Sequence, residues 1–369
     1  PREAGEHPFD NPAVKEILDL CLSCKGCKKE CPSTVDLAKL KAEFTQQYQD
    51  LYGVPLRSRL ISRFSDTQRL VRIAPSIWNL LFGTPWMRHL LNRLVGFHPD
   101  RTIPLAPPET LKQWFQRRPS VPGAGRHGAV WLLNDEFTNF TDVEVGKAAV
   151  ELLERLGYAV ALAPVSETGR SRLSKELLRE ARQIVQQNLR RLVPRVSADR
   201  PLVGVEPSAL LTFRDEAIDL AAPGQRQEAI ELSRHTLLLE EFLVREAKAG
   251  RVSAESFTTA KRVVRLHGHC FQKALAGIET ARAALSLPRS YEVISIPSGC
   301  CGMAGSFGYE REHYGLSMKI AELVLLPAIR TAAPEDLIAA AGTSCRHQIH
   351  DGCSRRAWHP AEILRDALV

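Results

Sequence analysis

The sequence predicts an α/β protein with largely parallel sheets, preceded by a helical N-terminal segment. Two observations predict this class. From residue 129 onward, short apolar runs alternate with helical patterns, as expected of strand–helix–strand units. In addition, three predicted strand ends in the first half resemble three in the second half at a nearly constant offset, which indicates a duplicated unit.

The composition excludes several classes of protein. The chain has 369 residues, of which 44% are hydrophobic and 25% charged, so a disordered chain is excluded. Its apolar runs are too short for a membrane span, and its first residues do not show the positive-then-apolar pattern expected of a signal peptide. The net charge of +7 is interpreted as a mild excess spread over the chain, which predicts no nucleic-acid partner. Because Pro1 is not Met, we expect a cut or processed end there.

Residues 1–97 are expected to be helical. Ser33 or Thr34 is expected to cap the second helix. Around Ile77 and Trp86 we favour a helix packed on its own domain over a membrane-surface or partner helix. The predicted helices are Val14–Leu20, Val35–Tyr48, Arg57–Ser65, Asp66–Ile73, Trp78–Phe82 and Met87–Val95.

A proline-rich stretch, residues 98–126, is predicted to be a linker. Residues 123–128 match the pattern G-x-G-x-x-G at its end. A dinucleotide-binding fingerprint must follow a strand and open a helix, whereas this match precedes an apolar run. It therefore does not predict a nucleotide site.

The remaining chain is predicted to form a first α/β repeat over 127–250 and a second over 251–369. The predicted strands are Ala129–Leu133, Ala159–Ala163, Leu202–Val205, Arg262–Leu266, Glu292–Ile296 and Asp336–Ala341. The predicted helices are Val143–Leu156, Leu173–Leu192, further helices to about residue 249, Phe271–Leu285, and one ending at Ile329.

The repeat decides how the later cysteines are interpreted. The matched strand ends begin at Leu132 and Leu266, Leu162 and Ser295, and Val205 and Ala341, which are offsets of 134, 133 and 136 residues. The second copy has cysteines where the first has other residues, because Cys270, Cys300, Cys301 and Cys345 correspond to Glu136, Glu167, Thr168 and Ala209. Since the carboxyl ends of parallel strands share one edge, we expect these four cysteines to meet.

A second motif lies near the N-terminus. Cys21, Cys24, Cys27 and Cys31, followed by Pro32, have the spacing C-x2-C-x2-C-x3-C-P of a bacterial-ferredoxin [4Fe–4S] site. We therefore predict an α-helical ferredoxin-like [4Fe–4S] domain over 1–97. Either Cys31 closes the local cluster or it binds one whose other ligands lie upstream. Lys25, Lys28 and Lys29 are expected to place positive charge near this cluster.

For the set Cys270, Cys300, Cys301 and Cys345, we favour an iron–sulfur cluster over zinc, since both accept four thiolates. The histidines beside this set are predicted to donate hydrogen bonds to sulfur, with ligation of a mixed zinc site as the alternative. They are His267, His269 and His347. Glu206 and the Arg214–Glu216 stretch are interpreted as salt-bridged structural residues rather than a pocket or docking surface. Cys353 is predicted to be an ordinary thiol, and we find no catalytic triad or phosphate loop.

The combination resembles the iron–sulfur proteins with cysteine-rich CCG domains, such as the heterodisulfide reductase B subunit and the iron–sulfur subunits of glycolate oxidase and anaerobic glycerol-3-phosphate dehydrogenase. The segments Cys21–Cys27, Val35–Phe44, Glu206–Asp215 and Gly299–Gly308 resemble one subgroup more closely. That subgroup comprises the bacterial FAD-linked 2-hydroxyacid dehydrogenases of the D-2-hydroxyglutarate or D-lactate type. The resemblance implies that Pro1 lies just past a flavin half.

What the resemblance implies is electron transfer from flavin, bound to an FAD-binding domain or partner subunit, to an external acceptor such as a quinone, cytochrome or carrier protein. The expected location is cytoplasmic, with peripheral contact at the inner membrane as a further option. Two rival functions remain open: a heterodisulfide or quinone reductase subunit with catalysis at the CCG site, and a zinc-stabilised assembly module.

Overall fold

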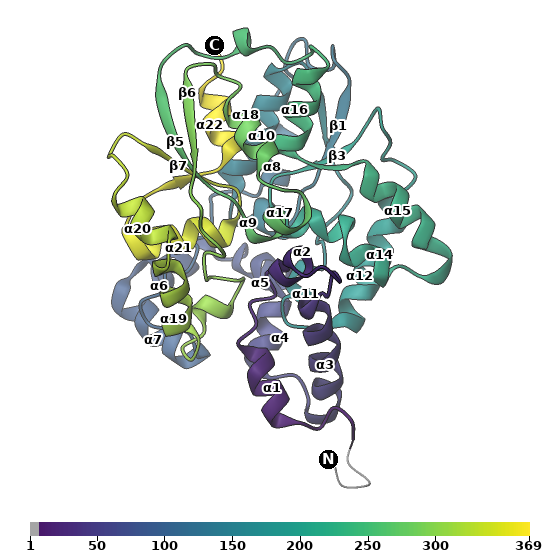
Figure 1. Cartoon of the computed structure of the whole chain (residues 1–369), viewed down its shortest axis with the longest axis vertical. Coiled ribbons are helices and arrows are strands. Elements are labelled where there is room, and N and C mark those ends of the chain that lie inside the picture. The colour runs from purple at the N-terminus through teal and green to yellow at the C-terminus, as the bar shows by residue number, and fades with distance from the viewer. Residues whose placement is uncertain (1–6) are drawn as a thin grey trace.

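A computed structural model describes residues 7–369. Two four-stranded sheets form its centre, and every strand pair in them is parallel (Figure 1). Their orders, β2-β1-β3-β4 and β6-β5-β7-β8, are the same order repeated, which confirms the α/β class and the duplication. The strands are β1 (Ala129–Leu132), β2 (Ala159–Leu162), β3 (Leu202–Gly204), β4 (Thr236–Leu238), β5 (Arg262–His267), β6 (Tyr291–Ser295), β7 (Leu337–Ala340) and β8 (Ala357–Trp358).

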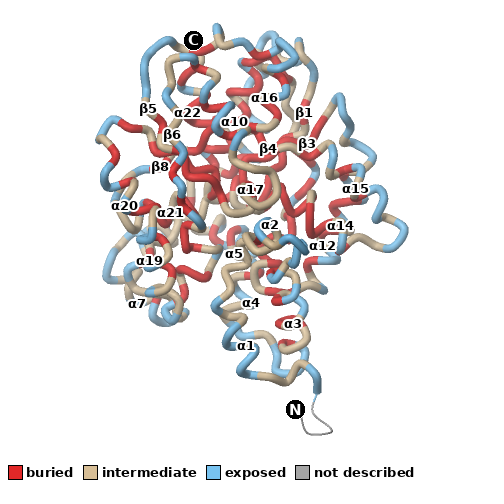
Figure 2. The backbone as a smooth tube through the Cα atoms, in the orientation of Figure 1, coloured by how far each residue is buried: buried red, intermediate tan, exposed pale blue. Residues whose placement is uncertain are grey.

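The helices between the two sheets form a shared core (Figures 1 and 2). They are α10 (Val143–Arg155), α16 (Leu239–Lys248), α18 (Glu279–Leu285) and α22 (Pro360–Asp366). Helix α10 packs on α22, and α16 packs on α18, so each pair joins the first repeat to the second. One hydrophobic cluster runs through both sheets and all four helices. The boundary between the repeats at residue 250 stays a prediction. The hydrophobic core is continuous across it.

Six predicted N-terminal helices are confirmed with shifted bounds. They are α1 (Pro12–Asp19), α3 (Leu37–Tyr52), α4 (Leu56–Ser62), α5 (Phe64–Val71), α6 (Pro75–Gly83) and α7 (Pro85–Val95). Helices α2 (Gly26–Glu30) and α8 (Leu111–Arg117) were not predicted, and α8, which Thr110 caps, lies within the predicted linker. The predicted cap of the second long helix was wrong. Asp36 caps α3 by accepting a hydrogen bond from the Lys39 N–H, and Thr34 has a left-handed φ of 53° that takes it out of the helix.

Several predicted helices of the repeats are divided in the structure. The predicted helix Phe271–Leu285 consists of α17 (Cys270–Leu275) and α18, because Gly277 adopts a left-handed φ of 81° between them. The predicted helix ending at Ile329 likewise consists of α19 (Tyr314–Glu322) and α20 (Leu325–Arg330). The other helices are α9 (Glu136–Phe140), α11 (Arg170–Leu173), α12 (Leu178–Leu192), α13 (Pro207–Leu210), α14 (Glu216–Leu220), α15 (Arg226–Arg234) and α21 (Thr343–Cys353).

Strands β4 and β8 were not predicted. Thr236–Leu238 was included among the helices to residue 249, but it pairs in register with β3 at the edge of the first sheet. Within residues 7–369, no helix has both the length and the apolar character needed to cross a bilayer.

Candidate metal centres

The first cysteine set surrounds α2: Cys21 and Cys24 lie in the loop between α1 and α2, Cys27 lies in α2, and Cys31 follows it. Ser23 and Lys25 take left-handed backbone angles, with φ of 51° and 61°, which wind the loop tightly. Burial raises the pKa of the Cys24 thiol, and the thiols of Cys21 and Cys27 are close enough to raise it further. Backbone N–H groups also point at this set, because Leu37 N–H donates to Cys27 Sγ over 3.3 Å. Three closely spaced thiols with N–H donors suit an anionic cluster.

Cys31 has a different environment from these three cysteines. It follows α2 directly, and the backbone N–H groups of Val35, Ser33 and Thr34 lower the pKa of its thiol. Hydrogen bonds from several N–H groups favour a thiolate, the form that binds metal. These hydrogen bonds therefore favour Cys31 as a metal ligand, either to the local cluster or to a cluster whose other ligands lie upstream.

The second cysteine set is assembled by three adjacent strands, as the repeat predicted. Cys270 opens α17 after β5, Cys300 and Cys301 follow β6, and Cys345 lies in the first turn of α21 after β7. The thiols contact one another in the order Cys270, Cys300, Cys301, Cys345. Hydrogen bonding to Cys300, together with burial, raises the pKa of Cys270 well above its ordinary value. Four thiolates so close require cations between them, which a metal or an iron–sulfur cluster supplies.

Glycine makes room around this set. A side chain at Gly302 would place its Cβ 2.2 Å from the Ser317 carbonyl oxygen, and the φ of Gly302 is 87°. A Cβ at Gly342 would lie 2.3 Å from the His269 ring. Both positions exclude larger residues, so the backbone comes close to the thiols.

His267 lies beside the second set and has a buried ring nitrogen without a partner in the described residues. Its side chain is buried, and its Nδ1 lies 2.7 Å from Ser298 Oγ. Its Nε2 has no hydrogen-bond partner in the described residues, although it is buried. The ligand atoms of His267, Cys301 and Cys345 all lie within 4.8 Å of one another. A buried nitrogen without a partner beside two thiols fits a group that is bound between them.

The other two histidines have partners in the protein. His269 Nδ1 accepts a hydrogen bond from the Phe271 N–H and so caps α17. His347 Nδ1 lies 3.0 Å from the Tyr309 hydroxyl. Cys353 is half-buried at the end of α21, and its Sγ lies 3.7 Å from the Leu326 carbonyl oxygen.

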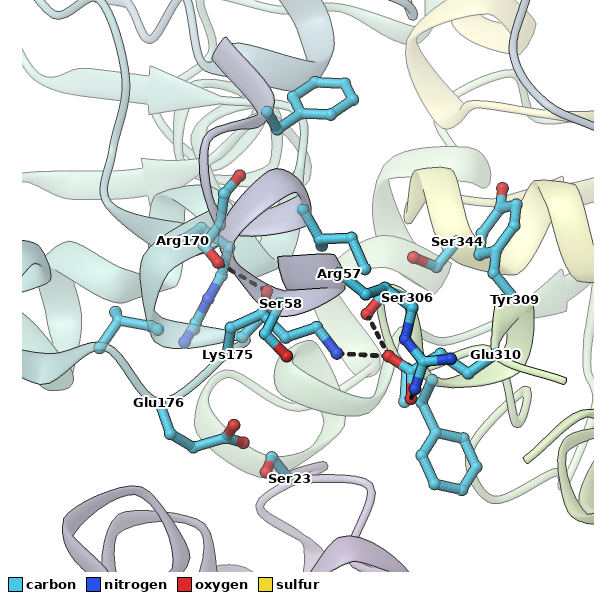
Figure 3. Close-up of a pocket in the computed structure, with 18 of the residues that line it drawn as sticks. Ser23, Arg57, Ser58, Arg170, Lys175, Glu176, Ser306, Tyr309, Glu310 and Ser344 are labelled. Atoms are coloured by element: carbon cyan, nitrogen blue, oxygen red, sulfur yellow. Dashed lines mark hydrogen bonds and ion pairs between the residues drawn. The ribbon is translucent and has the colours of Figure 1, made fainter. Parts of the chain in front are cut away.

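The two cysteine sets face each other. Helix α2 packs on α17, and Cys270 is among the charges that raise the pKa of Cys24. Cys21 of the first set and Cys270, Cys300 and Cys301 of the second line one cavity of about 980 Å³. Figure 3 shows this cavity, where Lys175 and Ser306 both approach the Glu310 carboxylate. Sequence spacing alone did not place the two sets side by side.

The loop of the first set is held on the first repeat by a buried ion cluster. Lys25 is 2% exposed, and its Nζ donates to Asp215 Oδ2 over 2.6 Å. Lys28 and Lys39 each donate to Asp215 Oδ1 over 2.7 Å. Lys25 and Lys28 lie among the cysteines of the first set as expected, and the sequence did not predict that Asp215 pairs with both. The structural interpretation of Asp215 is confirmed.

The first repeat has no metal-binding set at the equivalent position. The Glu136 carboxylate accepts hydrogen bonds from the Thr168 N–H over 2.8 Å and from the Thr168 hydroxyl over 3.0 Å. Ala209, which corresponds to Cys345, is fully buried. In the first repeat, the position that corresponds to the second cysteine set is thus occupied by a carboxylate and its hydrogen bonds.

Glu206 connects the two repeats beside the second set. Its Oε1 accepts from Ser208 N–H and caps α13, and its Oε2 accepts from Thr343 N–H over 2.8 Å. Thr343 is the first residue of α21, the helix that carries Cys345. Sequence reasoning missed this contact, since it joins residues 137 positions apart.

Comparisons with known proteins agree with this arrangement. The chain is 28% identical to a D-2-hydroxyglutarate dehydrogenase of Escherichia coli (strain K12), over 99% of this chain and 35% of that protein. It is 23% identical to one of the subunits of the anaerobic glycerol-3-phosphate dehydrogenase from the same strain, over 77% of this chain and 70% of that protein. It is 30% identical to lactate utilization protein A of Geobacillus kaustophilus (strain HTA426), over 44% of this chain and 67% of that protein. The chain spans about a third of the length of the D-2-hydroxyglutarate dehydrogenases it matches. No family model matches it.

Proposed function

We propose that this chain, which belongs to the same family as the D-2-hydroxyglutarate dehydrogenases and lactate utilization protein A, is the iron–sulfur electron-transfer module of an FAD-linked 2-hydroxyacid dehydrogenase. The observation that carries the proposal is the juxtaposition of the two cysteine sets across the α2–α17 contact. Two redox groups on facing loops provide a path along which single electrons move through the protein.

The residues divide into two ligand sets. Cys21, Cys24 and Cys27, with Cys31 as the fourth ligand or as a ligand to a neighbouring cluster, would hold a [4Fe–4S] cluster. The second set, Cys270, Cys300, Cys301 and Cys345, would hold a second iron–sulfur cluster. Such clusters supply one-electron chemistry when bound, and the protein sets their potentials through burial and hydrogen bonds to sulfur.

The chain's own groups tune these sites. Gly302 N–H points at Cys300 Sγ over 3.4 Å, in the same way that Leu37 N–H points at Cys27. Lys273 Nζ donates to the Gly299 carbonyl oxygen over 2.9 Å and so holds the Cys300–Cys301 loop with a positive charge beside it. N–H donors and a nearby cation stabilise the reduced, more negative state.

The electron donor in this proposal is FAD on a flavin-binding domain, which oxidises the 2-hydroxyacid. The helices beside the first set offer a docking surface for it, since Ile17 and Leu20 near α1 and Leu40 on α3 are 70%, 55% and 58% exposed. The acceptor is an external carrier, such as a quinone, a cytochrome or a carrier protein. We place the protein in the cytoplasm because clustered free thiols suit a reducing compartment.

One alternative has an observation in its favour. A nitrogen from His267 beside Cys301 and Cys345 is a donor set that zinc also accepts. In that case the second set is structural and only the first carries electrons.

Metal analysis of anaerobically purified full-length protein tests the proposal. We expect about eight irons per chain and no zinc, with EPR signals of two clusters after reduction. Cys24→Ser should remove the first signal and block electron transfer to an added acceptor. About four irons with one zinc would support the structural alternative instead, and an intact signal in Cys24→Ser would refute the assignment of the first set.

A further inference from the structure

The helices α4 to α7 leave an unusual amount of apolar side chain in contact with water. The exposed residues recur at helical spacing, with Trp86, Leu90 and Leu94 four residues apart along α7 and Ile77 and Leu80 three apart on α6. Ile73 is 79% exposed and Leu94 is 73% exposed. The full group is Leu56, Leu60, Leu70, Ile73, Ile77, Leu80, Trp86, Leu90, Leu94 and Val95.

The sequence predicts that the helix around Ile77 and Trp86 packs on its own domain, and the structure shows this for only part of the segment. Trp78 is packed on its own domain, because its Nε1–H donates to the Pro104 carbonyl oxygen over 3.1 Å and its ring lies 4.2 Å from that of Phe82. Its neighbours Ile77, Leu80 and Trp86 are more than half exposed. One side of these helices is therefore buried and the other has no cover in the described residues.

The same helices carry a local excess of positive charge. Residues 56–95 contain seven arginines and one acidic residue, a net charge of +6, while the whole chain carries +7. Residues 170–200 carry the same net charge of +6, from nine basic and three acidic residues, so this excess is one of several along the chain. By contrast, residues 12–52, which include α1 and α3, contain six lysines and six acidic residues and have no net charge.

Several of these arginines are free to meet a partner. Arg59, Arg63 and Arg93 are exposed, and none has a carboxylate within ion-pair distance among residues 7–369. Arg57 and Arg69 differ, since they pair with Glu312 and Asp66. The exposed side of α4 to α7 thus combines large apolar side chains with unpaired guanidinium groups.

We propose that the exposed side of α4 to α7, defined by the ten apolar residues above with Arg59, Arg63 and Arg93, docks on an anionic lipid bilayer. Short helices with apolar side chains on one side and basic residues around them lie in the interface plane of a membrane. Anionic headgroups attract the arginines, and the apolar side chains enter the boundary of the acyl chains. The positive charge of residues 56–95 favours an anionic lipid partner for this surface. Residues 12–52, which include α1 and α3, have no net charge and so no such attraction.

Within this surface, α6 and α7 lie apart from the first cysteine set, whereas α4 lies beside α1 and α3 (Figure 1). Helices α6 and α7 lie beside α19 at the lower left of Figure 1, while α1 and α3 extend downward at its bottom centre. A flavin-binding domain that docks near α1 therefore leaves α6 and α7 accessible. Leu60 is half-exposed and also lines the cavity of the two cysteine sets, so the docked side is an outer wall of that cavity.

The test is vesicle co-sedimentation of the full-length protein. Vesicles of phosphatidylcholine with phosphatidylglycerol should bind it, and phosphatidylcholine alone should bind it much less. Adding salt should release it, because the headgroup attraction is screened. The double variant Arg63→Gln/Arg93→Gln should weaken binding by about tenfold or more. Leu90→Asp/Leu94→Asp should abolish it, whereas the matched control Val369→Asp, at an apolar residue that is 79% exposed outside this surface, should bind like the wild type.

Three results would overturn the proposal. They are the absence of binding to anionic vesicles, equal binding of the Leu90→Asp/Leu94→Asp variant, and loss of binding in Val369→Asp as well. If Leu90→Asp/Leu94→Asp instead breaks an association with another protein chain, seen by size-exclusion chromatography, the surface is a protein interface. Vesicle binding requires no redox chemistry, so its outcome is independent of the proposed electron transfer.

Discussion

Glu136 accepts a hydrogen bond from the Thr168 N–H over 2.8 Å, and these two residues stand where the second repeat has Cys270 and Cys301. The strand ends that bring thiols together in one copy bring a carboxylate and a hydroxyl together in the other. A direct hydrogen bond between protein groups thus stands at the position equivalent to the proposed cofactor site. The first repeat keeps the arrangement of strand ends seen at the second cysteine set, but the residues there form hydrogen bonds that stabilise the fold.

Glu136→Ala should therefore reduce stability without affecting metal content. It leaves the buried Thr168 N–H and hydroxyl without an acceptor, which costs about 1–3 kcal/mol of the free energy of unfolding. Denaturant unfolding under anaerobic conditions measures the loss, and Thr168→Ser, which keeps both donors, serves as the control. Loss of iron in Glu136→Ala would show that the first repeat binds a cluster after all.

Cys345→Ser should remove the group bound at the second set and leave the first set loaded. Cys353→Ser, on the same helix, should change neither, because Cys353 is separated from the set and contacts the Leu326 carbonyl. Iron content and the EPR spectrum distinguish the two variants. Equal iron in Cys345→Ser and wild type would remove Cys345 from the ligand set.

His267 is a positioning residue for the second set in this proposal, because its free Nε2 lies beside Cys301 and Cys345. As a donor to cluster sulfur it would stabilise the reduced state, so His267→Leu should lower the reduction potential of the second cluster at unchanged iron content. His267→Gln retains an N–H donor at a similar reach and should restore most of the potential. If both variants lose iron, His267 is a direct ligand instead.

Asp215 is the residue on which the docking of the first cysteine loop depends most. Burial alone would raise the pKa of Asp215, but Lys25, Lys28 and Lys39 outweigh it and hold that pKa well below its usual range. Asp215→Asn leaves the buried Lys25 with weaker partners and should cost about 3 kcal/mol or more of stability. The first cluster should also become easier to extract with a chelator. Asp219→Asn, which changes an exposed partner of Lys39, should have little effect.

Glu240 makes stability depend on pH. Burial raises the pKa of Glu240 to about 7, and neither carboxylate oxygen has a hydrogen-bond partner in the described residues. Since the unfolded chain releases this proton near pH 4.5, folding carries a penalty that grows from there through about pH 7. Glu240→Gln should thus be more stable than wild type at pH 8, by up to about 3 kcal/mol, and similar near pH 4.

The neighbouring residue provides the control for that comparison. Glu241 pairs with Arg214 over 2.6 Å and accepts from the Leu238 N–H over 2.9 Å. Glu241→Gln should therefore lose stability at pH 8, where Glu240→Gln gains it. A Glu240→Gln variant with the same pH profile as wild type would contradict the raised pKa.

The sequence was informative wherever the signal was local or repeated. The offset between strand ends correctly brought Cys270, Cys300, Cys301 and Cys345 together, because residues after parallel strands share one edge. β4 and β8 were missed because two or three residues are too few to show a periodicity. The Lys25–Asp215 pair was unpredictable for another reason, since its members lie 190 residues apart. Only the fold decides which distant charges meet.

The pairing of α10 with α22 and of α16 with α18 bears on how the duplication arose and on whether either repeat can fold alone. In each repeat, one helix follows the first strand and one follows the last, and each contacts the opposite kind in the other repeat. This reciprocal pattern is that of an isologous homodimer joined into a single chain. A fragment ending near residue 250 would expose the apolar sides of α10 and α16 to water, so neither half should be expressed alone as a folded protein.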